Sequence, residues 1–278
     1  AVETAAHPVA GAPCMRVTVS LPREGVYRLR VQDARSALSA TTNPIVCSPK
    51  ADPVYWGMIH GHTELSDGTG KIDYYFQQLK NEAGLDFAAS SDHDHLYETP
   101  DEYWQVTQDA VKRWNAPGEF VAFLGYEWAK WRKNGDADRN VYYLEDDRPM
   151  YRSDEGHYAS PPELFAVLEQ NQEEAIVIPH HTGHGGNWCD WKDYDGEYSR
   201  LVEIFQVRGS YECAPEDGNP IPEPSSDPPP FPTGYVRNAL ALGWRVGFTA
   251  GGDDHRGQWG TEFRFGPGGT GHKQGLMY

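Results

Sequence analysis

The sequence VYWGMIHGH at residues 54–62 decides the fold, because a run of strand-forming residues ends there directly in His60 and His62. The same arrangement recurs at residues 85–95, LDFAASSDHDH, and at residues 175–184, AIVIPHHTGH. A side chain that binds a metal ion must present its lone pair from a rigid position, and the end of a strand is such a position. Repeated strand ends that carry histidine therefore predict a metal-dependent enzyme.

A fourth cluster, Asp253-Asp254-His255, follows the strand-like residues 245–249. From about residue 53 onward, strands alternate with helical segments that have one apolar face, at residues 72–83, 104–114 and 164–168. This alternation predicts a mostly parallel sheet, either an α/β barrel or an open α/β sheet. In an α/β barrel the functional residues gather at the C-terminal ends of the strands, which is where these clusters stand.

Residues 1–50 have a different pattern, because residues 16–21 and 25–31 alternate apolar and polar side chains as half-buried strands do. Two such strands do not bury a core by themselves. We therefore expect a small β segment over residues 1–50, either the end of a β-sandwich or a hairpin packed on the main domain, and the barrel over residues 51–278. Residues 214–232 carry eight prolines and predict either a lid or a plain surface loop.

The composition restricts the partners. The 278 residues are 38% hydrophobic, enough for a barrel-sized domain with a real core. A formal net charge of −17 argues against a nucleic-acid partner, since neutralising phosphates requires clustered Lys and Arg. No run approaches the roughly 18 apolar residues that cross a bilayer, so we expect no membrane partner. The oligomeric state does not follow from the sequence.

Four cysteines, Cys14, Cys47, Cys189 and Cys213, show no CxxC spacing, which argues against a thiolate zinc site. Cys14 and Cys47 flank the N-terminal strands and form the more natural disulfide pair, which would place the chain in a secreted or periplasmic compartment. Four free thiols, which would fit the cytoplasm, are the alternative. No charged-then-apolar signal segment follows Ala1, so we expect an N-terminus that is processed or set by expression.

The order of the motifs resembles that of the polymerase and histidinol phosphatase (PHP) superfamily. The motifs are HGH at 60–62, SDG at 66–68, SDHD at 91–94, a strand-end Glu127, Pro-His at 179–180 and Asp253-x-His255. The local sequences YWG at 55–57, GYEW at 125–128 and RNVY at 139–142 resemble those of a large uncharacterised hydrolase-like branch of that superfamily. The resemblance covers residues 53–260.

This resemblance implies a distorted (β/α)7 barrel, similar to a TIM barrel, that follows the small β segment. It also implies two or three divalent ions of zinc, manganese or iron. After His255 the chain offers a Gly-rich stretch and then ends, so we expect a barrel that is incomplete at the C-terminus. The last helix would be missing, displaced to the N-terminal side or supplied by another chain.

The resemblance further implies which residues bind the ions. One metal would take His60, His62, Glu127 and Asp253, and a second would share Glu127 and use His180. Bridging carboxylates such as Glu127 hold two cations a few ångströms apart, and a water between the cations loses a proton near neutral pH. Glu127 and His180 are therefore predicted to be catalytic as well as metal-binding.

A third metal would use His93, His255 and an oxygen from Asp67, and His255 is a further candidate for a catalytic role. Asp94, next to His93, is expected to orient a ligand or to face solvent more than to bind a metal itself.

The second metal lacks one ligand, because no convincing His or Cys stands between Glu127 and the Pro-His motif. His157 is the only candidate by order, and His181 or Glu203 could complete the set instead. Three residues are predicted to contact the substrate because they lie near the motifs: Arg139, His184 and Arg256.

The predicted function is hydrolysis by an activated water, and the superfamily association suggests a small phosphoester as the small-molecule substrate. A carboxylic ester, amide or carbamate is the alternative, since the cations also stabilise charge on an acyl oxygen. An amidohydrolase barrel also opens with HxH, but it usually has a strand-end Lys and a lone final Asp, unlike Asp253-x-His255. A non-catalytic metal-binding or glycan-binding module would instead show a closed ligand shell.

Overall fold

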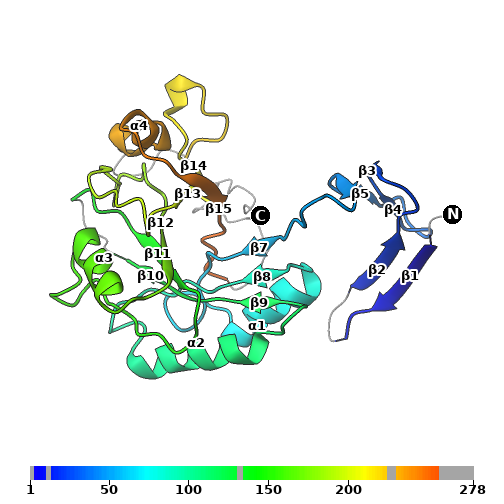
Figure 1. The fold of residues 1–278 in the computed structure, drawn as a ribbon, viewed down its shortest axis with the longest axis horizontal. Helices are drawn as coiled ribbons and strands as arrows, with labels where there is room; N and C mark the ends of the chain where they lie inside the picture. Colours follow the sequence, from blue (N-terminus) through cyan, green and yellow to red (C-terminus); the bar gives the residue numbers. More distant parts are fainter. Residues whose placement is uncertain (1–2, 11–13, 130–133, 224–229, 257–278) are drawn as a thin grey trace. The chain divides into compact units, whose positions relative to one another are not determined.

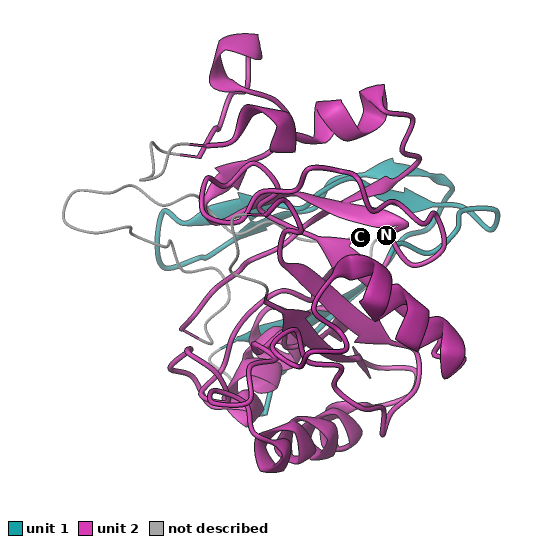
Figure 2. Ribbon diagram, turned by 90° about the vertical axis from the view of Figure 1, so that its left-hand side faces the viewer, with its two compact units in different colours: residues 1–54 teal, residues 55–278 magenta. Residues whose placement is uncertain are grey.

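The structure is a computed structural model that describes residues 3–10, 14–129, 134–223 and 230–256. The chain divides into two units, unit 1 at residues 1–54 and unit 2 at residues 55–278 (Figure 2). Within the described ranges, no helix has the length and apolar character needed to span a membrane. The predicted open end of the barrel falls on residues 257–278 and therefore lies outside the described residues.

Unit 1 consists of two-stranded antiparallel ribbons. The pairs are β1 (Glu3–Pro8) with β2 (Met15–Ser20), β3 (Gly25–Tyr27) with β6 (Ile45–Cys47), and β4 (Arg30–Gln32) with β5 (Ser39–Thr41). The strand predicted over residues 25–31 is interrupted at Leu29, whose N–H donates to Thr42 Oγ1 at 3.0 Å. Val17, Val26 and Leu38 are exposed, as expected of ribbons that are too narrow to enclose a core.

The structure does not contain the predicted disulfide between Cys14 and Cys47. Cys47 ends β6 opposite Gly25, while the carbonyl of Cys14 accepts a hydrogen bond from the N–H of Val9 at 3.1 Å. No disulfide joins any two of the four cysteines, all of which lie in the described ranges. The compartment stays a prediction.

Unit 2 has the predicted mixed α/β character. Its first sheet is parallel, with β7 (Gly57–Met58), β8 (Phe87–Ala88) and β9 (Val121–Ala122) side by side in that order (Figure 1). Beyond these short strands the pairing continues as isolated parallel bridges, from His93 to Glu127 and from Gly61 to Asp254. The bridges bring the ends of distant strands together at one edge.

The second sheet differs from the predicted parallel arrangement. Strand β11 (Arg139–Tyr143) runs antiparallel to both β10 (Leu124–Trp128) and β12 (Ala175–Pro179). Only residues 129–138 separate β10 from β11, which is fewer than the dozen or more residues that a parallel crossover needs. The beginning of β11 therefore lies at the same edge as the end of β10.

In the third sheet, β13 (Leu201–Gln206) pairs in parallel with β15 (Gly247–Ala250) and antiparallel with β14 (Gly209–Ser210). Within the described ranges no ladder pairs β12 with β13, so the strand pairing does not form a complete barrel. The complete barrel stays a prediction.

The helices cover these sheets and bury the main core. They are α1 (Ile72–Gln77), continued by a π-helical turn at Gln78–Glu82, α2 (Asp101–Trp114), α3 (Pro161–Gln170) and α4 (Val236–Ala241). The first three lie where the apolar spacing predicts them, and α4 was not predicted. In α2, Trp104 and Val111 point into the core that Phe76 and Leu79 of the first helical segment also fill. This packing fixes the strands whose ends carry the histidines.

Candidate metal centre

The end of β7 carries the first two histidines. His60 and His62 stand two residues apart, so both can face the same side of an extended chain, and both are buried. Gly61 between them lies against Tyr75, and a Cβ added to Gly61 would stand only 2.8 Å from the Tyr75 hydroxyl. The glycine therefore lets the two-histidine segment pack closely on α1.

Donor group A consists of His60, His62, Glu127 and Asp253, whose ligand atoms lie within 4.8 Å of one another. Oε2 of Glu127 lies 3.4 Å from His60 Nε2 and 3.2 Å from His62 Nε2. Oδ1 of Asp253 lies 3.6 Å and 3.3 Å from the same two nitrogens. Strand ends far apart in the chain thus bring two imidazoles and two carboxylates together.

Donor group B consists of Glu127, Asp138, His180 and His181, again with ligand atoms within 4.8 Å of one another. Here Glu127 uses its other oxygen, because Oε1 lies 3.2 Å from His180 Nε2. His181 Nε2 lies 3.5 Å from Asp138 Oδ2. Glu127 therefore directs one oxygen toward each of two donor groups, as a bridging carboxylate does.

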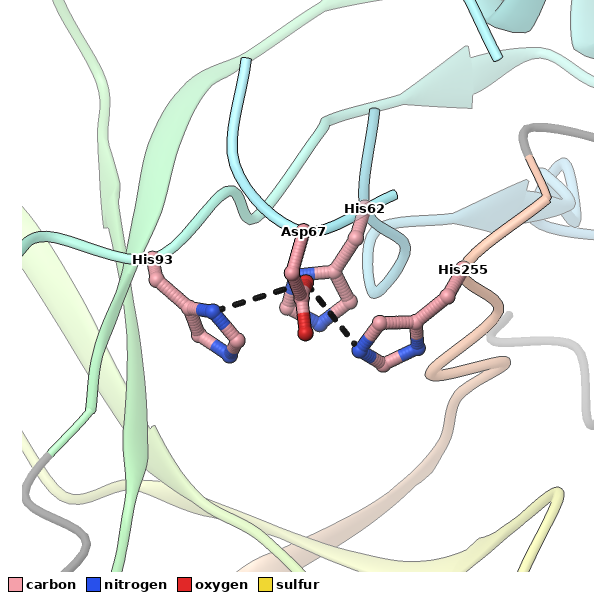
Figure 3. A group of neighbouring side chains, drawn as sticks. All are labelled: His62, Asp67, His93 and His255. Atoms are coloured by element: carbon pink, nitrogen blue, oxygen red, sulfur yellow. Dashed lines mark ion pairs between the residues drawn. The ribbon is translucent and has the colours of Figure 1, made fainter. Parts of the chain in front are cut away.

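Donor group C consists of His62, Asp67, His93 and His255. Figure 3 shows His93 and His255 on either side of Asp67, whose Oδ1 lies 3.5 Å from His93 Nδ1 and 3.3 Å from His255 Nε2. His62 faces this group with Nδ1, at 3.9 Å from Asp67, and group A with Nε2. A neutral imidazole has one lone pair, so His62 can bind a cation in only one of the two groups.

The buried nitrogens in these groups fit bound cations. His60 Nε2 and both ring nitrogens of His62 and His180 are buried without a hydrogen-bond partner among the described residues. A buried polar atom left without a partner costs roughly 1–3 kcal/mol. The His60 and His180 rings lie close together, with centroids 4.3 Å apart, although neither Nε2 atom has a hydrogen-bond partner among the described residues. A divalent cation that accepts these lone pairs removes the cost, and His with carboxylate suits zinc, manganese or iron.

The local environment shifts the donor histidines in opposite directions. Against the effect of burial, nearby carboxylates raise the pKa of His60, His62 and His93, whereas three others are shifted toward the neutral form that binds a metal. Burial lowers the pKa of His180, and burial together with the nearby His180 lowers the pKa of His181. Burial, followed by the neighbouring His62, lowers the pKa of His255 to about 4.

Two of these ligand candidates have strained backbones. Asp253 has φ 50° and His181 has φ 30°, in the left-handed region that residues other than glycine rarely adopt. Such strain costs about 1–3 kcal/mol at each position and persists where the surroundings enforce it, often at functional sites.

Glu203 orients His60 and does not belong to a donor group. Its Oε2 accepts a hydrogen bond from His60 Nδ1 at 2.8 Å, which leaves Nε2 of the ring directed to group A. Gly251 makes room for this contact, because an added Cβ there would collide with the Glu203 carboxylate. The sequence offered Glu203 as a ligand of the second metal, whereas the geometry favours a role in orienting His60.

Replacing Glu203 by Gln is therefore expected to weaken metal binding by about tenfold to hundredfold, the usual cost of losing the carboxylate behind a ligating histidine. Competition with a chromophoric chelator measures the affinity. The exposed Glu197→Gln is the matched control and is expected to bind metal like the wild type. Equal affinities in the two variants would contradict this role of Glu203.

Two aspartates beside His93 support the site from outside the donor groups. Asp92 accepts hydrogen bonds from the Thr63 N–H at 2.7 Å and the Ser66 hydroxyl at 2.7 Å, which fixes the loop that carries Asp67. Asp94 faces away from the donor groups, where it accepts the Ser153 hydroxyl at 3.0 Å, and burial raises its pKa to about 7. Asp94 is fully buried and therefore does not face solvent, and its role in orienting a ligand stays a prediction.

A cavity of about 390 Å³ opens above the donor groups. Its lining residues are Asp67, His93, Glu127, Asp138, His181, His184, Gly186, Asn187, Arg208, Asp253 and His255. Arg208 is held at the cavity wall by Gln206, whose Oε1 accepts from Arg208 Nη1 at 3.2 Å, and by an ion pair with Asp253. The Arg208 guanidinium at the cavity wall suits an anionic group.

Three predicted residues lie elsewhere. His157 is exposed and belongs to no donor group, so the structure does not bring it to the second metal. Arg139 is buried under Phe165, and its Nε donates to the Asp136 carbonyl at 3.2 Å. Arg256 is exposed and does not line the cavity. The predicted substrate contacts were Arg139, His184 and Arg256, and of these only His184 lines the cavity.

The sequence interpretation missed Asp138 and Arg208. Asp138 stands immediately before β11, whereas the barrel pattern predicts functional residues at the C-terminal ends of strands. Because β11 is antiparallel, its start lies at the edge where the parallel strands end. Arg208 follows β13 by two residues, so the strand-end rule could have found it.

Comparison with known families gives one match. The family described as "Protein of unknown function (DUF3604)" matches residues 67–220, more than half of the chain. Uncharacterized proteins of Chlamydia muridarum (strain MoPn / Nigg) and Chlamydia trachomatis serovar D are 28% and 26% identical to this chain. Each alignment covers 84% of this chain and 37% of the relative, so the chain spans little more than a third of these proteins.

Solved structures show weaker likeness. A two-domain protein from Bacteroides vulgatus, described as containing a predicted PHP-like metal-dependent phosphoesterase, aligns with TM-score 0.46 and 13% identity over 73% of this chain and 52% of that one. PsfC from Pseudomonas syringae aligns with TM-score 0.44 and 17% identity over 73% and 77%. A putative metal-dependent phosphoesterase from Bifidobacterium adolescentis aligns with TM-score 0.40 and 15% identity over 80% and 93%. Likeness at this level does not establish a shared activity.

Proposed function

The chain belongs to the family described as protein of unknown function DUF3604. From the three donor groups and the order of the motifs that carry them, we propose that it is a metal-dependent hydrolase. The observation that carries the proposal is the position of Glu127. Its Oε1 faces His180 and its Oε2 faces His60 and His62, at 3.2 to 3.4 Å. A buried carboxylate between imidazoles on both sides is suited to bridge two cations.

Two or three divalent ions, of zinc, manganese or iron, are the proposed cofactors. Group A and group B would each hold one ion with Glu127 between them, and Asp67, His93 and His255 would hold a third. When bound, such ions supply a water of lowered pKa and stabilise negative charge on the attacked group. We also propose that the short sheets of unit 2 belong to a distorted (β/α)7 barrel, as the motif order implies.

A small phosphoester is the proposed substrate. The cavity of about 390 Å³ matches a small molecule. Arg208 and the Asn187 side chain stand on its wall, and a guanidinium favours a phosphoryl oxygen over a neutral acyl group. The ion pair with Asp253 and the hydrogen bond to Gln206 hold the guanidinium in place before a substrate arrives.

Metal removal tests this proposal. Dialysis against a chelator is expected to abolish hydrolysis of an aryl phosphate, because the buried imidazoles cannot activate water without the ions. Adding Mn²⁺ or Zn²⁺ should restore the rate, and elemental analysis should find two or three ions per chain. An aryl acetate and an aryl carbamate, assayed under the same metal loading, test the acyl alternative. Metal-loaded protein that hydrolyses none of these esters would contradict the hydrolase assignment.

A further inference from the structure

A hydrogen-bonded chain of three side chains stands on the cavity wall outside the donor groups. His184 Nδ1 lies 2.8 Å from Glu223 Oε1, and the Tyr211 hydroxyl donates to Glu223 Oε2 at 3.1 Å. Glu223 and Tyr211 are buried, whereas the His184 side chain is 27% exposed and lines the cavity. The Glu223 carboxylate thus holds one ring nitrogen of an imidazole that is itself partly exposed.

The Pro-rich segment 214–232 carries Glu223, and its described residues are fixed to the loop that carries His184. The Phe231 N–H donates to the Gly183 carbonyl at 2.6 Å, and the Phe231 ring stacks on Trp188 with centroids 4.1 Å apart. At the other side, Pro222 pairs with Ser210 in an isolated bridge. These contacts fix the described part of the segment to the loop that carries His184, although none of its described residues lines the cavity. The lid and the plain surface loop both stay predictions.

The chemistry of the chain determines the form of His184. An ionised carboxylate only accepts hydrogen bonds, so Nδ1 of His184 must carry the proton that it shares with Glu223. In the neutral ring, Nε2 then keeps its lone pair. Nε2 lies beside Gly186, where an added Cβ would stand 3.0 Å away, and Gly186 also lines the cavity. His184 and Gly186 both line the cavity, so this acceptor nitrogen lies at the cavity wall.

We propose that Glu223 is a positioning residue that holds His184 in the Nδ1–H form, so that Nε2 accepts a hydrogen bond from a hydroxyl or amine of the substrate. This inference rests on the proposed hydrolase function and makes its substrate class narrower. The substrate is then an ester that carries a second hydrogen-bond donor within reach of His184. Tyr211 completes the arrangement by occupying the second oxygen of Glu223.

The form of His184 can be read without any activity. Long-range nitrogen–proton NMR of histidine-labelled, metal-loaded protein in mildly alkaline buffer should show His184 with its proton on Nδ1. In Glu223→Gln the side-chain amide would donate to Nδ1, and the proton of His184 should move to Nε2. Glu216→Gln, at an exposed position of the same segment, should leave the spectrum of His184 unchanged.

Binding of stable phosphonates tests the substrate contact. Calorimetry on metal-loaded protein compares 2-hydroxyethylphosphonate and 3-hydroxypropylphosphonate with ethylphosphonate, which lacks the hydroxyl. The wild type and Glu216→Gln should bind the better hydroxylated ligand about tenfold more tightly, as one added hydrogen bond predicts. His184→Ala and Glu223→Gln should lose this preference but keep their affinity for ethylphosphonate.

The outcomes separate this inference from the hydrolase proposal. If ethylphosphonate binds and no hydroxylated ligand is preferred, or if His184 carries its proton on Nε2 in the wild type, the inference is wrong while the metal centre stands. If the preference appears but no ester is hydrolysed, the contact between His184 and a ligand hydroxyl holds, while the hydrolase proposal, and with it the ester as substrate, is wrong. If no phosphonate binds and no ester is hydrolysed, both are wrong.

Discussion

Glu127→Gln is expected to remove at least one metal ion per chain and to lower the hydrolysis rate by roughly 10²–10³-fold or more, the loss typical of removing one group that stabilises the transition state. The carboxylate faces group A with one oxygen and group B with the other. An amide keeps the shape of the side chain but offers a single neutral oxygen, which cannot bridge two cations. Elemental analysis and kcat/KM on an aryl phosphate measure the two effects.

Glu119→Gln is the matched control, because the Glu119 side chain is 75% exposed and lies outside the donor groups. It is expected to keep the wild-type metal content and rate. A Glu127→Gln protein that binds the full number of ions would exclude Glu127 as the bridge. The metal centre would then need a different shared ligand.

Asp138→Asn is expected to lose the ion of group B and to lower the rate by roughly 10²-fold, since an amide binds a cation far more weakly than a carboxylate does. Its Oδ2 lies 3.5 Å from His181 Nε2, and both side chains are buried. His157→Gln, at the position that the sequence order offered, should change neither metal content nor rate, because His157 is exposed.

Counting the bound metal ions in the two variants shows whether Asp138 or His157 is a ligand of the second metal. Unfolding of both variants in chelator provides the stability control, because it separates loss of an ion from damage to the fold. If His157→Gln loses an ion and Asp138→Asn does not, the second metal is bound differently from group B.

The sequence was sufficient to predict which strand ends meet. His60, His180 and Asp253 each follow a strand-like run, and the C-terminal ends of neighbouring strands gather at one edge whatever the connecting helices are. The structure brings these side chains to within 4.8 Å of a shared partner, Glu127. Their roles as ligands stay predictions until metal is measured.

The sequence was insufficient where the direction of a strand, or a contact between residues far apart in the chain, determines which residues reach the site. The alternation of strands and helices predicts parallel strands and does not indicate that β11 reverses, so Asp138, which precedes β11, was missed as a candidate ligand. Glu223 reaches His184 from a segment with no repeating pattern, because prolines set its course and the contact spans 39 positions. Such contacts follow from tertiary packing, which local propensity does not encode.

The imidazole of His62 faces group A with one nitrogen and group C with the other. The donor group that takes the lone pair of His62 leaves the other group with one ligand fewer. Metal binding at the two groups is therefore coupled. The order in which the ions bind, and their identity, would thereby determine which ligands remain for the next ion.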